Sequence, residues 1–491
     1  MKRVGKKLQA SLVGGLLLML MSFIPSCSGV SADKDPGPNA GQRAMIARKY
    51  GMFLHYGMNT YLGVEWSDGK APAGRYAPPA DMARKAASWV RNARRAGMRS
   101  IVLTVKHHDG FCLWDSRYTD YDVMHPDVEN KVDIVRVVSD ACRDEGIAFS
   151  IYYSLWDRHE ASYRDKDPYS YIRFMKNQLQ ELMTGYGPVS ELWFDGAWDR
   201  KIDDWYLQEV YDFVKSLQPA CQIAVNHTIG KRPVDMRRGD TIKYFPADFR
   251  LWDPYLPMAD DNKIYLHNGK KYYLPYETTQ TISVLGNWFS NPADTTVRDV
   301  EELEEIFHVA TANDNCLLLN VPPGMDGAQR PAYVDRITEL ADRLGIRDGK
   351  PFPPSAKLPA SRVRAHATSV WGGDTLHWGA QYAVDSDVST AWQGDSLATL
   401  TLHFPQRRTF RTVSVITGRG SIHRYGLEAC RQGEWHCFHR GDIDPEKEPA
   451  SFMGYGFINL ALEESIEADS LRITIAESNG KPQIYSIRLK E

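Results

Sequence analysis

The sequence has little net charge, few cysteines and no Gly-rich phosphate-binding loop. Its 59 Lys and Arg nearly balance 62 Asp and Glu, so the net charge of −3 offers no basic surface for nucleic acid or for an anionic membrane. The cysteines show no C-x-x-C or Cys/His metal-ligand spacing, and apart from Cys27 we expect buried thiols rather than a disulfide framework. Cys430 and Cys437 could form a bridge in an oxidising compartment. These absences argue against a nucleic-acid-binding protein and against a small disulfide-stabilised fold.

The chain is instead long and rich in aromatic residues. Its 491 residues, 43% of them hydrophobic, predict two or three domains with an ample core. The 13 Trp and 25 Tyr have amphipathic rings that pack on the apolar faces of sugars, although composition alone does not distinguish this from core packing.

Residues 1–27 are predicted to be an export signal. Basic residues between Lys2 and Lys7 precede an apolar run that is shorter than the roughly 20 residues of an ordinary transmembrane helix. The segment around Cys27 is similar to a bacterial lipobox, so we expect a lipid anchor at Cys27, with plain secretion or a retained leader as alternatives. Residues 28–42 are rich in Gly, Pro and Ser and are a predicted tether. The expected location is the periplasm or cell surface of a bacterium, or the medium.

The mature chain shows two different patterns of apolar and polar residues. From 43 to 347, strand-like and helix-like segments alternate, which predicts a (β/α)₈-type barrel. Residues 348–361 form a Pro-rich linker, and 362–491 show short alternating runs typical of an antiparallel β-sandwich. The candidate strands of the barrel are Met52–His55, Ser100–Val105, Ala148–Tyr153, Glu191–Phe194, Gln222–Val225, Ile242–Phe245 and Leu317–Val321, and its candidate helices are Asp81–Ala96, Val132–Glu145, Pro168–Thr184, Asp203–Leu217, Val300–Ala312 and Pro331–Leu344.

Polar side chains that follow the apolar strands are the first functional candidates, because the carboxyl ends of parallel strands meet at one rim of a barrel. Four segments place such side chains at the end of a candidate strand: Phe53–Gly57, Leu103–Phe111, Leu192–Gly196 and Pro275–Gln280.

Two of these segments contain a carboxylate. Asp195 follows Trp193 and Phe194 and precedes a glycine, which is the setting of a nucleophilic Asp, with a helix cap as the alternative. Glu277 would be the second carboxylate of a glycosidase pair, with a surface ion pair as the alternative. Such pairs lie about 5–5.5 Å apart in retaining enzymes and about 6.5–9.5 Å apart in inverting ones.

His55, His107 and His108 raise the question of a metal site, since His and Asp are common metal ligands. Adjacent residues at a strand end point to opposite faces, however, so one ion would not readily take both His107 and His108. We therefore expect no metal here. Neutral imidazoles that hydrogen-bond sugar hydroxyls fit better, and structural histidines are the alternative.

Together these segments resemble glycoside hydrolase family 29, the α-L-fucosidases, over most of residues 45–345. The segments that carry the resemblance are H-Y-G at His55, K-H-H-D-G-F from Lys106, Y-Y-S-L-W-D from Tyr152, L-W-F-D-G from Leu192 and N-V-P-P-G-M-D-G from Asn320. The resemblance implies a retaining exo-glycosidase in which Asp195 attacks the anomeric carbon, and which needs no cofactor.

The resemblance also implies the residues that bind the sugar. Their side chains would hydrogen-bond hydroxyls or line the pocket: His55, Glu65, Trp66, His107, His108 and Trp193, with Tyr153 as a lesser candidate whose hydroxyl could stabilise the nucleophile. L-fucose has a C6 methyl group, so one end of its pocket should be apolar, and Trp288 and Phe289 are candidates for that wall, or for the core.

The acid/base is harder to assign from the resemblance. Glu277 lies in a segment similar to the family's W-E-T-C type, and it is the predicted acid/base. Other members place a Glu on an earlier loop, where this chain has none, so Asp240 or Asp248 are alternatives. Asn226-His227-Thr228 also departs from the family's N-D-R.

The C-terminal segment resembles a discoidin-like, galactose-binding type of β-sandwich, on the basis of residues 382–392 and 471–475. In that fold the Asp-rich loop sometimes binds Ca²⁺ structurally, and the module either binds sugar or only supports the barrel.

We therefore expect an exo-α-L-fucosidase that acts on fucosylated oligosaccharides or glycoconjugates and that meets a membrane only through its lipid anchor. Two alternatives remain open: a glycosidase for another galacto-configured or 6-deoxy sugar, and a catalytically impaired glycan-binding lipoprotein.

Overall fold

The computed structural model describes residues 35–229, 245–257, 263–353, 363–385, 390–448, 451 and 454–490. The predicted export signal with Cys27, residues 28–34 of the predicted tether, and Asp240 lie outside these residues. None of the helices in the described ranges combines the length and apolar character that crossing a bilayer requires.

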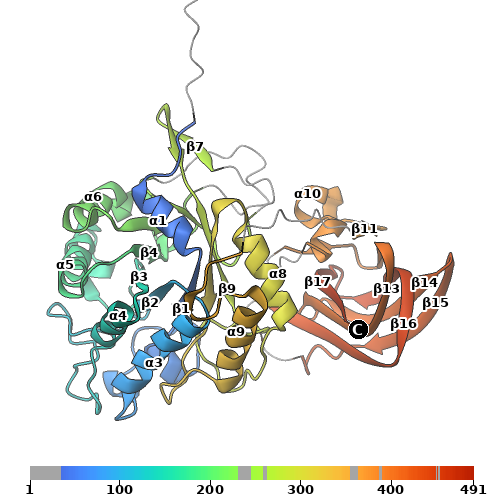
Figure 1. Ribbon diagram of the computed structural model, residues 1–491, viewed down its shortest axis with the longest axis horizontal. Coiled ribbons are helices and arrows are strands. Elements are labelled where there is room, and N and C mark those ends of the chain that lie inside the picture. Colours follow the sequence, from blue (N-terminus) through green and yellow to red (C-terminus); the bar gives the residue numbers. More distant parts are fainter. Residues whose placement is uncertain are drawn as a thin grey trace, which may run out of the picture. The chain divides into compact units, whose positions relative to one another are not determined.

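Eight parallel strands of the described chain form a nearly closed barrel, in the order β5-β4-β3-β2-β1-β10-β9-β6 (Figure 1). Backbone hydrogen bonds from Asp248 to Ile223 (2.7 Å) and from His227 to Leu251 (3.3 Å) join β6 to β5 and bring the two ends of the sheet together. The strands are β1 (Tyr50–Leu54), β2 (Ser100–Lys106), β3 (Ala148–Ser154), β4 (Glu191–Asp195), β5 (Gln222–Val225), β6 (Arg250–Leu251), β9 (Tyr276–Thr281) and β10 (Cys316–Asn320).

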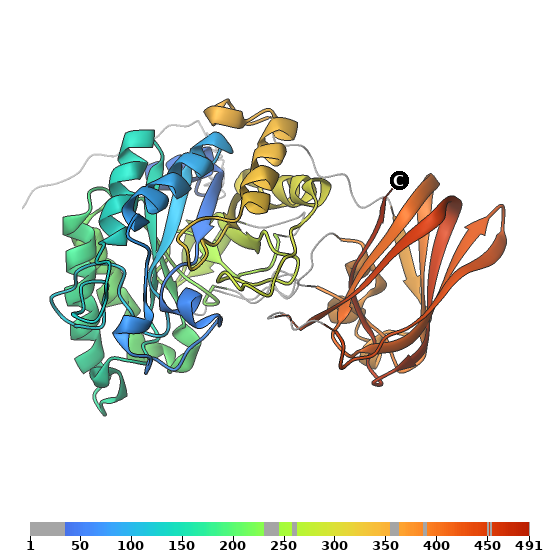
Figure 2. The ribbon, with the colours of Figure 1, turned by 90° about the horizontal axis from the view of Figure 1, so that it is seen from below.

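Helices cover the outer side of these strands (Figure 2). They form where apolar residues recur at helical spacing: α3 buries Met82, Ala86, Trp89, Val90 and Ala93 against the sheet. The helices are α1 (Ala40–Arg48), α2 (Met58–Leu62), α3 (Met82–Arg95), α4 (Ile134–Glu145), α5 (Tyr169–Gly185), α6 (Leu207–Leu217), α8 (Val300–Ala310) and α9 (Pro331–Leu344). Short 3₁₀ turns lie at Ala73–Arg75, Ala161–Arg164, Ala197–Asp199 (η3), Ile202–Trp205, Ala312–Asp314 and Arg347–Gly349.

The predicted fold class is confirmed, and two predicted elements differ. The sixth strand of the barrel is β6, whereas most of the predicted strand Ile242–Phe245 lies outside the described residues. Pro275–Gln280 was expected to be the end of a strand, but it makes up almost all of one, β9. The prediction failed because β9 reads Y-E-T-T-Q-T, and its polar side chains are buried inside the protein, where they hide the apolar signal of a strand.

The inside of the barrel is filled by side chains. Phe53, Tyr152 and Trp193 form an aromatic cluster on its axis, with the Phe53 and Trp193 rings 5.2 Å apart. Each of these rings is almost completely buried. The barrel is therefore a packed core, and its chemistry has to take place at the ends of the strands.

The C-terminal part of the chain is an antiparallel β-domain, as predicted. Its strands pair in the order β12-β17-β13-β16-β14-β15, with β11 on β13. The two longest, β13 and β16, change register at two bulges, and the sheet encloses a core of its own around Trp392, Leu427 and Ile473. Its strands are β11 (Arg364–Ala367), β12 (Trp392–Gln393), β13 (Ala398–Gly418), β14 (Ile422–Arg431), β15 (Glu434–Asp442), β16 (Tyr455–Ser478) and β17 (Gln483–Lys490), with the one-turn helix α10 (Thr375–Trp378) and 3₁₀ turns at Trp371–Gly373 and Ala380–Ala383.

The described cysteines are all free thiols, including Cys430 and Cys437. Cys437 is exposed, so the expectation of buried thiols is wrong for this residue, which lies on the outer strand β15. In the Asp-rich loop, the Asp385 carboxylate accepts a hydrogen bond from Thr390, and residues 386–389 lie outside the described chain, so Ca²⁺ binding stays a prediction.

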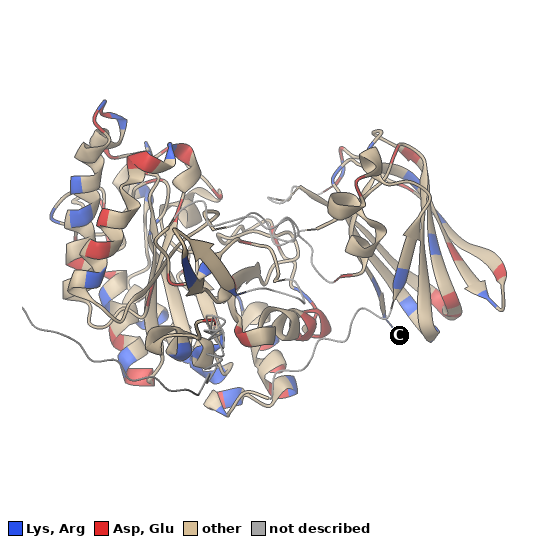
Figure 3. Cartoon of the chain, turned by 90° about the horizontal axis from the view of Figure 1, so that it is seen from above, with Lys and Arg blue, Asp and Glu red and all other residues tan. Residues whose placement is uncertain are grey.

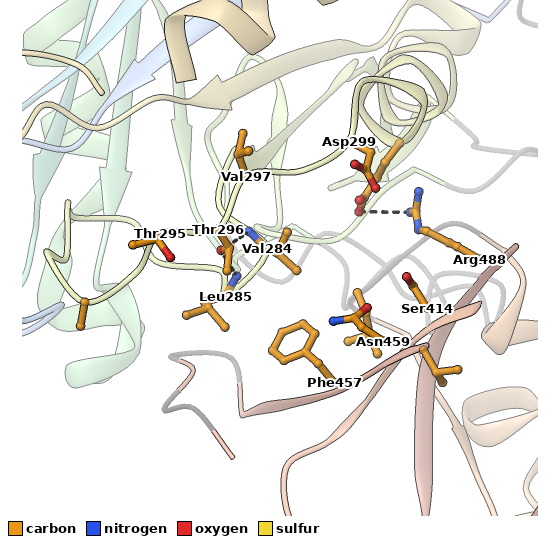
Figure 4. Close-up of a pocket in the computed structure, with 14 residues that line it drawn as sticks. Val284, Leu285, Thr295, Thr296, Val297, Asp299, Ser414, Phe457, Asn459 and Arg488 are labelled. Carbon is orange, nitrogen blue, oxygen red and sulfur yellow. Dashed lines mark hydrogen bonds and ion pairs between the residues drawn. The ribbon is translucent and has the colours of Figure 1, made fainter. Parts of the chain in front are cut away.

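Basic and acidic side chains alternate over the outer helices, which agrees with the small net charge (Figure 3). The loop after β9 lines a cavity of about 490 Å³, where Thr296 Oγ1 accepts the backbone N–H of Val284 and Leu285 (Figure 4). The residues around this cavity include none of the predicted site residues. A small hairpin, β7 (Ile264–His267) and β8 (Lys270–Tyr273), precedes β9.

Candidate active site

The predicted nucleophile Asp195 is the last residue of β4, at the carboxyl end of the barrel. Its carboxylate accepts hydrogen bonds from the Tyr152 hydroxyl (2.7 Å) and from the Asn226 side-chain amide (3.0 Å). His108 Nε2 lies 3.6 Å from the same carboxylate. The Asp195 side chain keeps 12% of its surface exposed, so it is held rigidly and still reaches the open end of the barrel.

The three predicted histidines lie together beside Asp195. Their rings contact one another, with centroids 4.2 Å apart for His107 and His108 and 6.0 Å apart for His55 and His107. Burial lowers the pKa of His55 to about 4 and that of His108 to about 3, and it lowers the pKa of His107 well below its ordinary value. All three imidazoles are therefore neutral at physiological pH.

Their hydrogen-bond partners decide which nitrogen carries the proton. The Ser154 hydroxyl donates to the Trp156 carbonyl, so His108 Nδ1 donates to Ser154 (2.7 Å) and its Nε2 is left as an acceptor. The Asn320 amide donates to the Trp288 carbonyl, which turns its oxygen toward His55 Nδ1 (2.8 Å) and again leaves Nε2 as the acceptor.

His107 has the opposite tautomer. Its Nδ1 faces the Asn59 side-chain amide nitrogen (3.3 Å), which also donates to the Glu65 carbonyl, so Nδ1 accepts and Nε2 carries the proton. The cluster thus combines acceptor and donor imidazoles, which suits a sugar with several hydroxyls.

Glu65 and Trp66 join this cluster from the loop after α2. The Glu65 carboxyl accepts the backbone N–H of Trp288 (3.0 Å) and of Phe289 (3.3 Å), and burial raises its pKa to about 8. Glu65 is therefore mostly protonated at neutral pH and can donate a hydrogen bond. The Trp66 ring packs 5.5 Å from His108 and is 44% exposed.

Trp288 and Phe289 form one apolar side of the cluster. Their rings lie 5.2 Å and 5.4 Å from the His55 ring, and both are largely buried. The structure therefore brings Trp288 to the predicted site.

A second carboxylate, which the sequence did not single out, lies beside Asp195. Asp253 follows β6, and its side chain accepts a hydrogen bond from the same Asn226 amide nitrogen that binds Asp195. Two acceptors of one amide group lie within about 6 Å of each other. The backbone N–H of Asp253 contacts the Asn226 side-chain oxygen (3.4 Å), which fixes the orientation of the shared amide.

The two carboxylates influence each other's protonation. Burial, and next the charge of Asp253, raise the pKa of Asp195 to about 6. Burial acts in the same direction on Asp253, but hydrogen bonds and charge from His227 and Asn226 outweigh it and lower the pKa of Asp253. Two carboxyls at such a distance titrate as a pair, and the pair keeps one proton up to about pH 6.

Glu277 is not at this end of the barrel. It is the second residue of β9 and lies inside the barrel, where its carboxyl accepts a hydrogen bond from Trp193 Nε1 (2.7 Å). Burial, together with the charge of Glu191, raises the pKa of Glu277. Glu191 pairs with Arg48 and is the first residue of β4, whereas Asp195 is the last. Because Glu277 senses the charge of Glu191, it lies toward the amino end of the strands, and the geometry does not favour it as the partner of Asp195.

The alternative Asp248 is also engaged elsewhere. It lies before β6 and binds the Tyr211 hydroxyl (2.9 Å), Lys215 Nζ (2.7 Å) and the backbone N–H of Ile223 (2.9 Å). These contacts connect α6 with the start of the barrel strands, which is a structural role.

Comparison with known proteins identifies the family of this chain. A family model described as alpha-L-fucosidase matches residues 42–348. The chain belongs to the α-L-fucosidase family. It is therefore a glycoside hydrolase.

Relatives of the family match over most of the chain. Alpha-L-fucosidase 1 of Arabidopsis thaliana is 26% identical over 473 residues, which cover 92% of this chain and 87% of that protein. The tissue alpha-L-fucosidase of Homo sapiens is 23% identical over 399 residues, which cover 73% of this chain and 81% of that protein.

Solved structures share the fold. Alpha-L-fucosidase isoenzyme 1 from Paenibacillus thiaminolyticus has a TM-score of 0.53 at 20% identity, over 90% of this chain and 99% of that one. A glycoside hydrolase 29 family member from a rumen bacterium has a TM-score of 0.52 at 24% identity, over 93% of this chain and 77% of that one.

One residue predicted from the fucosidase resemblance, Tyr153, points elsewhere than expected. The hydroxyl that reaches Asp195 belongs to Tyr152, whereas Tyr153 faces α5 and donates to Gln178 (2.6 Å). Neighbours on a strand face opposite sides, so only one residue of this pair can point into the barrel. Trp193 shares the inner face with Asp195, lies beneath the site and holds Glu277.

Proposed function

We propose that this protein is a retaining exo-α-L-fucosidase with Asp195 as nucleophile and Asp253 as general acid/base. One observation carries the proposal: both carboxylates bind the same amide group of Asn226 at the open end of the barrel. This limits their separation to about 6 Å, which includes the range of about 5–5.5 Å for retaining pairs and is below that of inverting pairs.

The two steps follow from these positions. In the free protein the pKa shifts favour the pair's one proton on Asp195, and the productive form is the one in which this proton is on Asp253 and Asp195 is ionised. In that form Asp195 attacks the anomeric carbon, the bond from this carbon to the glycosidic oxygen breaks, and Asp253 gives the proton to the leaving oxygen. A water molecule then attacks the same carbon, loses a proton to Asp253, and displaces Asp195. Double inversion retains the configuration. The two carboxyls supply both the nucleophile and the proton, so the reaction needs no cofactor.

The surroundings of Asp195 suit L-fucose. Acceptor nitrogens on His55 and His108, a donor nitrogen on His107 and the protonated Glu65 carboxyl can each pair with a hydroxyl group. The Trp288 and Phe289 rings provide an apolar wall for the C6 methyl. Phe53 and Trp193 fill the barrel below and form the floor of this pocket.

The predicted leader supports export, with lipidation of Cys27 as the anchor. We infer that the substrates are fucosylated oligosaccharides or glycoconjugates outside the cytoplasm.

The decisive experiment is chemical rescue of the two variants with azide. Asp195→Gly should be inactive, and azide should restore turnover and give fucosyl azide of inverted configuration. Asp253→Gly should keep activity on aryl fucosides with good leaving groups, and azide should give fucosyl azide of retained configuration, because azide then intercepts the glycosyl-enzyme. Proton NMR of the azide products distinguishes the two.

The pH profile provides an independent readout. The productive form holds one proton on the pair, so kcat/KM of the wild type should fall as the pH rises through about 6, and Asp253→Asn should lose this fall in kcat/KM.

The variants Asp248→Asn and Glu277→Gln test the other candidates for the acid/base. If Glu277→Gln, and not Asp253→Asn, becomes dependent on the leaving group, Glu277 is the acid. If the wild type does not hydrolyse nitrophenyl fucosides but hydrolyses a nitrophenyl glycoside of another sugar, that sugar replaces fucose as the proposed substrate.

A further inference from the structure

Trp198 is a large aromatic residue that stays exposed directly beside the catalytic carboxylates. It lies in the 3₁₀ turn η3, three residues after Asp195, and 45% of its surface is exposed. Exposing a Trp costs the protein the free energy that burial would provide, so an exposed Trp beside an active site is a candidate for ligand contact.

The Trp198 ring connects the two halves of the carboxylate pair. On one side it packs edge-on against His108, with centroids 5.9 Å apart, and His108 faces Asp195. On the other side it lies 5.4 Å from the His227 ring at a tilt of 35°, and His227 Nε2 is 3.3 Å from the Asp253 carboxylate.

The rest of this surface is also aromatic. His227 lies 4.7 Å from the half-buried ring of Trp252, next to Asp253, and Trp66 and Trp156 contact each other and His108 on the other side. The nearby guanidinium of Arg158 stacks on Trp156 (3.9 Å) and donates to the Ser67 carbonyl, so it is already engaged.

The position and the chemistry of this aromatic surface indicate which part of the substrate binds there. The acid protonates the glycosidic oxygen, so the group attached to that oxygen has to lie on the Asp253 side of the site. A pyranose ring has an apolar face of C–H groups that packs on an indole ring. A neutral ring suits a surface where Arg158, the cation described beside it, is already engaged.

We propose that Trp198, with Trp252 beside it, forms the binding site for the leaving-group sugar, which is a neutral pyranose. This rests on the proposed fucosidase function and deepens it, because it assigns the recognition of the glycan beyond its terminal sugar to a specific side chain.

The experiment compares two substrates that differ only in the leaving group. A disaccharide with fucose linked α to galactose has a leaving sugar, whereas α-L-fucosyl fluoride has none. For both, kcat/KM reports the steps up to cleavage of the glycosidic bond. In Trp198→Ala, we expect the ratio of the disaccharide value to the fluoride value to fall about tenfold, the size of a lost aromatic contact. Trp198→Phe keeps a ring and should recover part of that ratio.

Tyr118→Ala is the matched control. Tyr118 is similarly exposed, at 43%, but its neighbours Ser116 and Arg117 bind Glu181 on the outer helix α5. Its ratio should equal that of the wild type. A ratio within twofold of the wild type in Trp198→Ala overturns the inference while leaving the fucosidase proposal intact. A wild type that cleaves neither substrate overturns both.

Discussion

At the scale of single residues, the environment of Asp195 disfavours its ionised form. Asp195 is buried and lies beside a second carboxylate, and these two effects raise its pKa from 3.8 to about 6. Hydrogen bonds from Tyr152 and Asn226 act in the opposite direction but do not cancel them. Ionised Asp195 is therefore less stable in the folded protein than in the unfolded chain, a cost that the proposed nucleophile imposes on the fold.

This unfavourable environment predicts that Asp195→Asn stabilises the protein. At pH 7 the variant should gain up to about 3 kcal/mol in the free energy of unfolding, since each pKa unit corresponds to about 1.4 kcal/mol. Well below pH 4 Asp195 is protonated in both the folded and the unfolded state, so the gain should disappear there, grow as the pH rises from about 4 to about 6, and stay constant above that. Urea unfolding at pH 7 and pH 4 measures both values. A gain of equal size at the two pH values would contradict this explanation.

The sequence predicted those site residues that both belong to a family motif and lie at the end of an apolar strand. Asp195, His55, His107 and His108 all follow apolar strands, and the structure brings them together. Asp253 was missed because β6 has only two residues and shows no alternating run that would mark its end. Tyr152 was missed because the choice between it and Tyr153 depends on which face of β3 points inward, and Y-Y reads the same either way.

At the scale of elements, the turn from β4 into η3 positions both Asp195 and Trp198. Gly196 makes this turn at φ +81°, and a Cβ added there would lie 2.7 Å from the Trp156 Cβ and 3.1 Å from its backbone nitrogen. Trp156 belongs to the loop after β3, so the two loops approach each other as closely as a glycine permits.

We therefore expect Gly196→Ala to disturb both stability and catalysis. Left-handed backbone alone costs an alanine about 1 kcal/mol, and the clash with Trp156 should bring the total to about 2–4 kcal/mol. A displacement of Asp195 should lower kcat/KM by at least about tenfold. Gly187→Ala is the control, because its φ is +79° but no atom lies within 4 Å of the added Cβ. Thermal unfolding and fucoside kinetics compare them, and equal effects in the two variants would refute a role for the close approach.

Elements with strong periodicity were predicted to within a few residues, as for α3 and α5. β9 was not, because Glu277, Thr279 and their neighbours are polar but buried, and only the assembled barrel provides their partners. The predicted acid was misplaced for the same reason: its segment was taken as the end of a strand when Glu277 lies near the start of one.

At the scale of the whole molecule, the chain has separate hydrophobic cores. One group of buried residues, which includes Trp89 and Ile337, belongs to the barrel, and another, around Trp392 and Leu427, belongs to the β-domain. The clusters of the described residues share no member between these two parts. Parts that do not share a core can unfold separately.

Calorimetry should therefore resolve two unfolding transitions. L-fucose binds only the folded barrel in the proposed function, so saturating fucose should raise the midpoint of one transition by several degrees and leave the other in place. A matched concentration of D-glucose is the control sugar. A single transition that fucose shifts as a whole would show that the two parts unfold together.

The aromatic cluster on the barrel axis has a kinetic consequence. Because Phe53 and Trp193 close the space beneath Asp195, both products of the proposed reaction have to leave through the opening by which the glycan entered. The leaving sugar lies nearer that opening and departs first, while fucose is still bound to Asp195. Water then arrives along the vacated route, and an alcohol or a second sugar in that position competes with it. In the proposed mechanism, the packed floor thus sets the order of product release, and transfer of fucose to an acceptor is the expected side reaction.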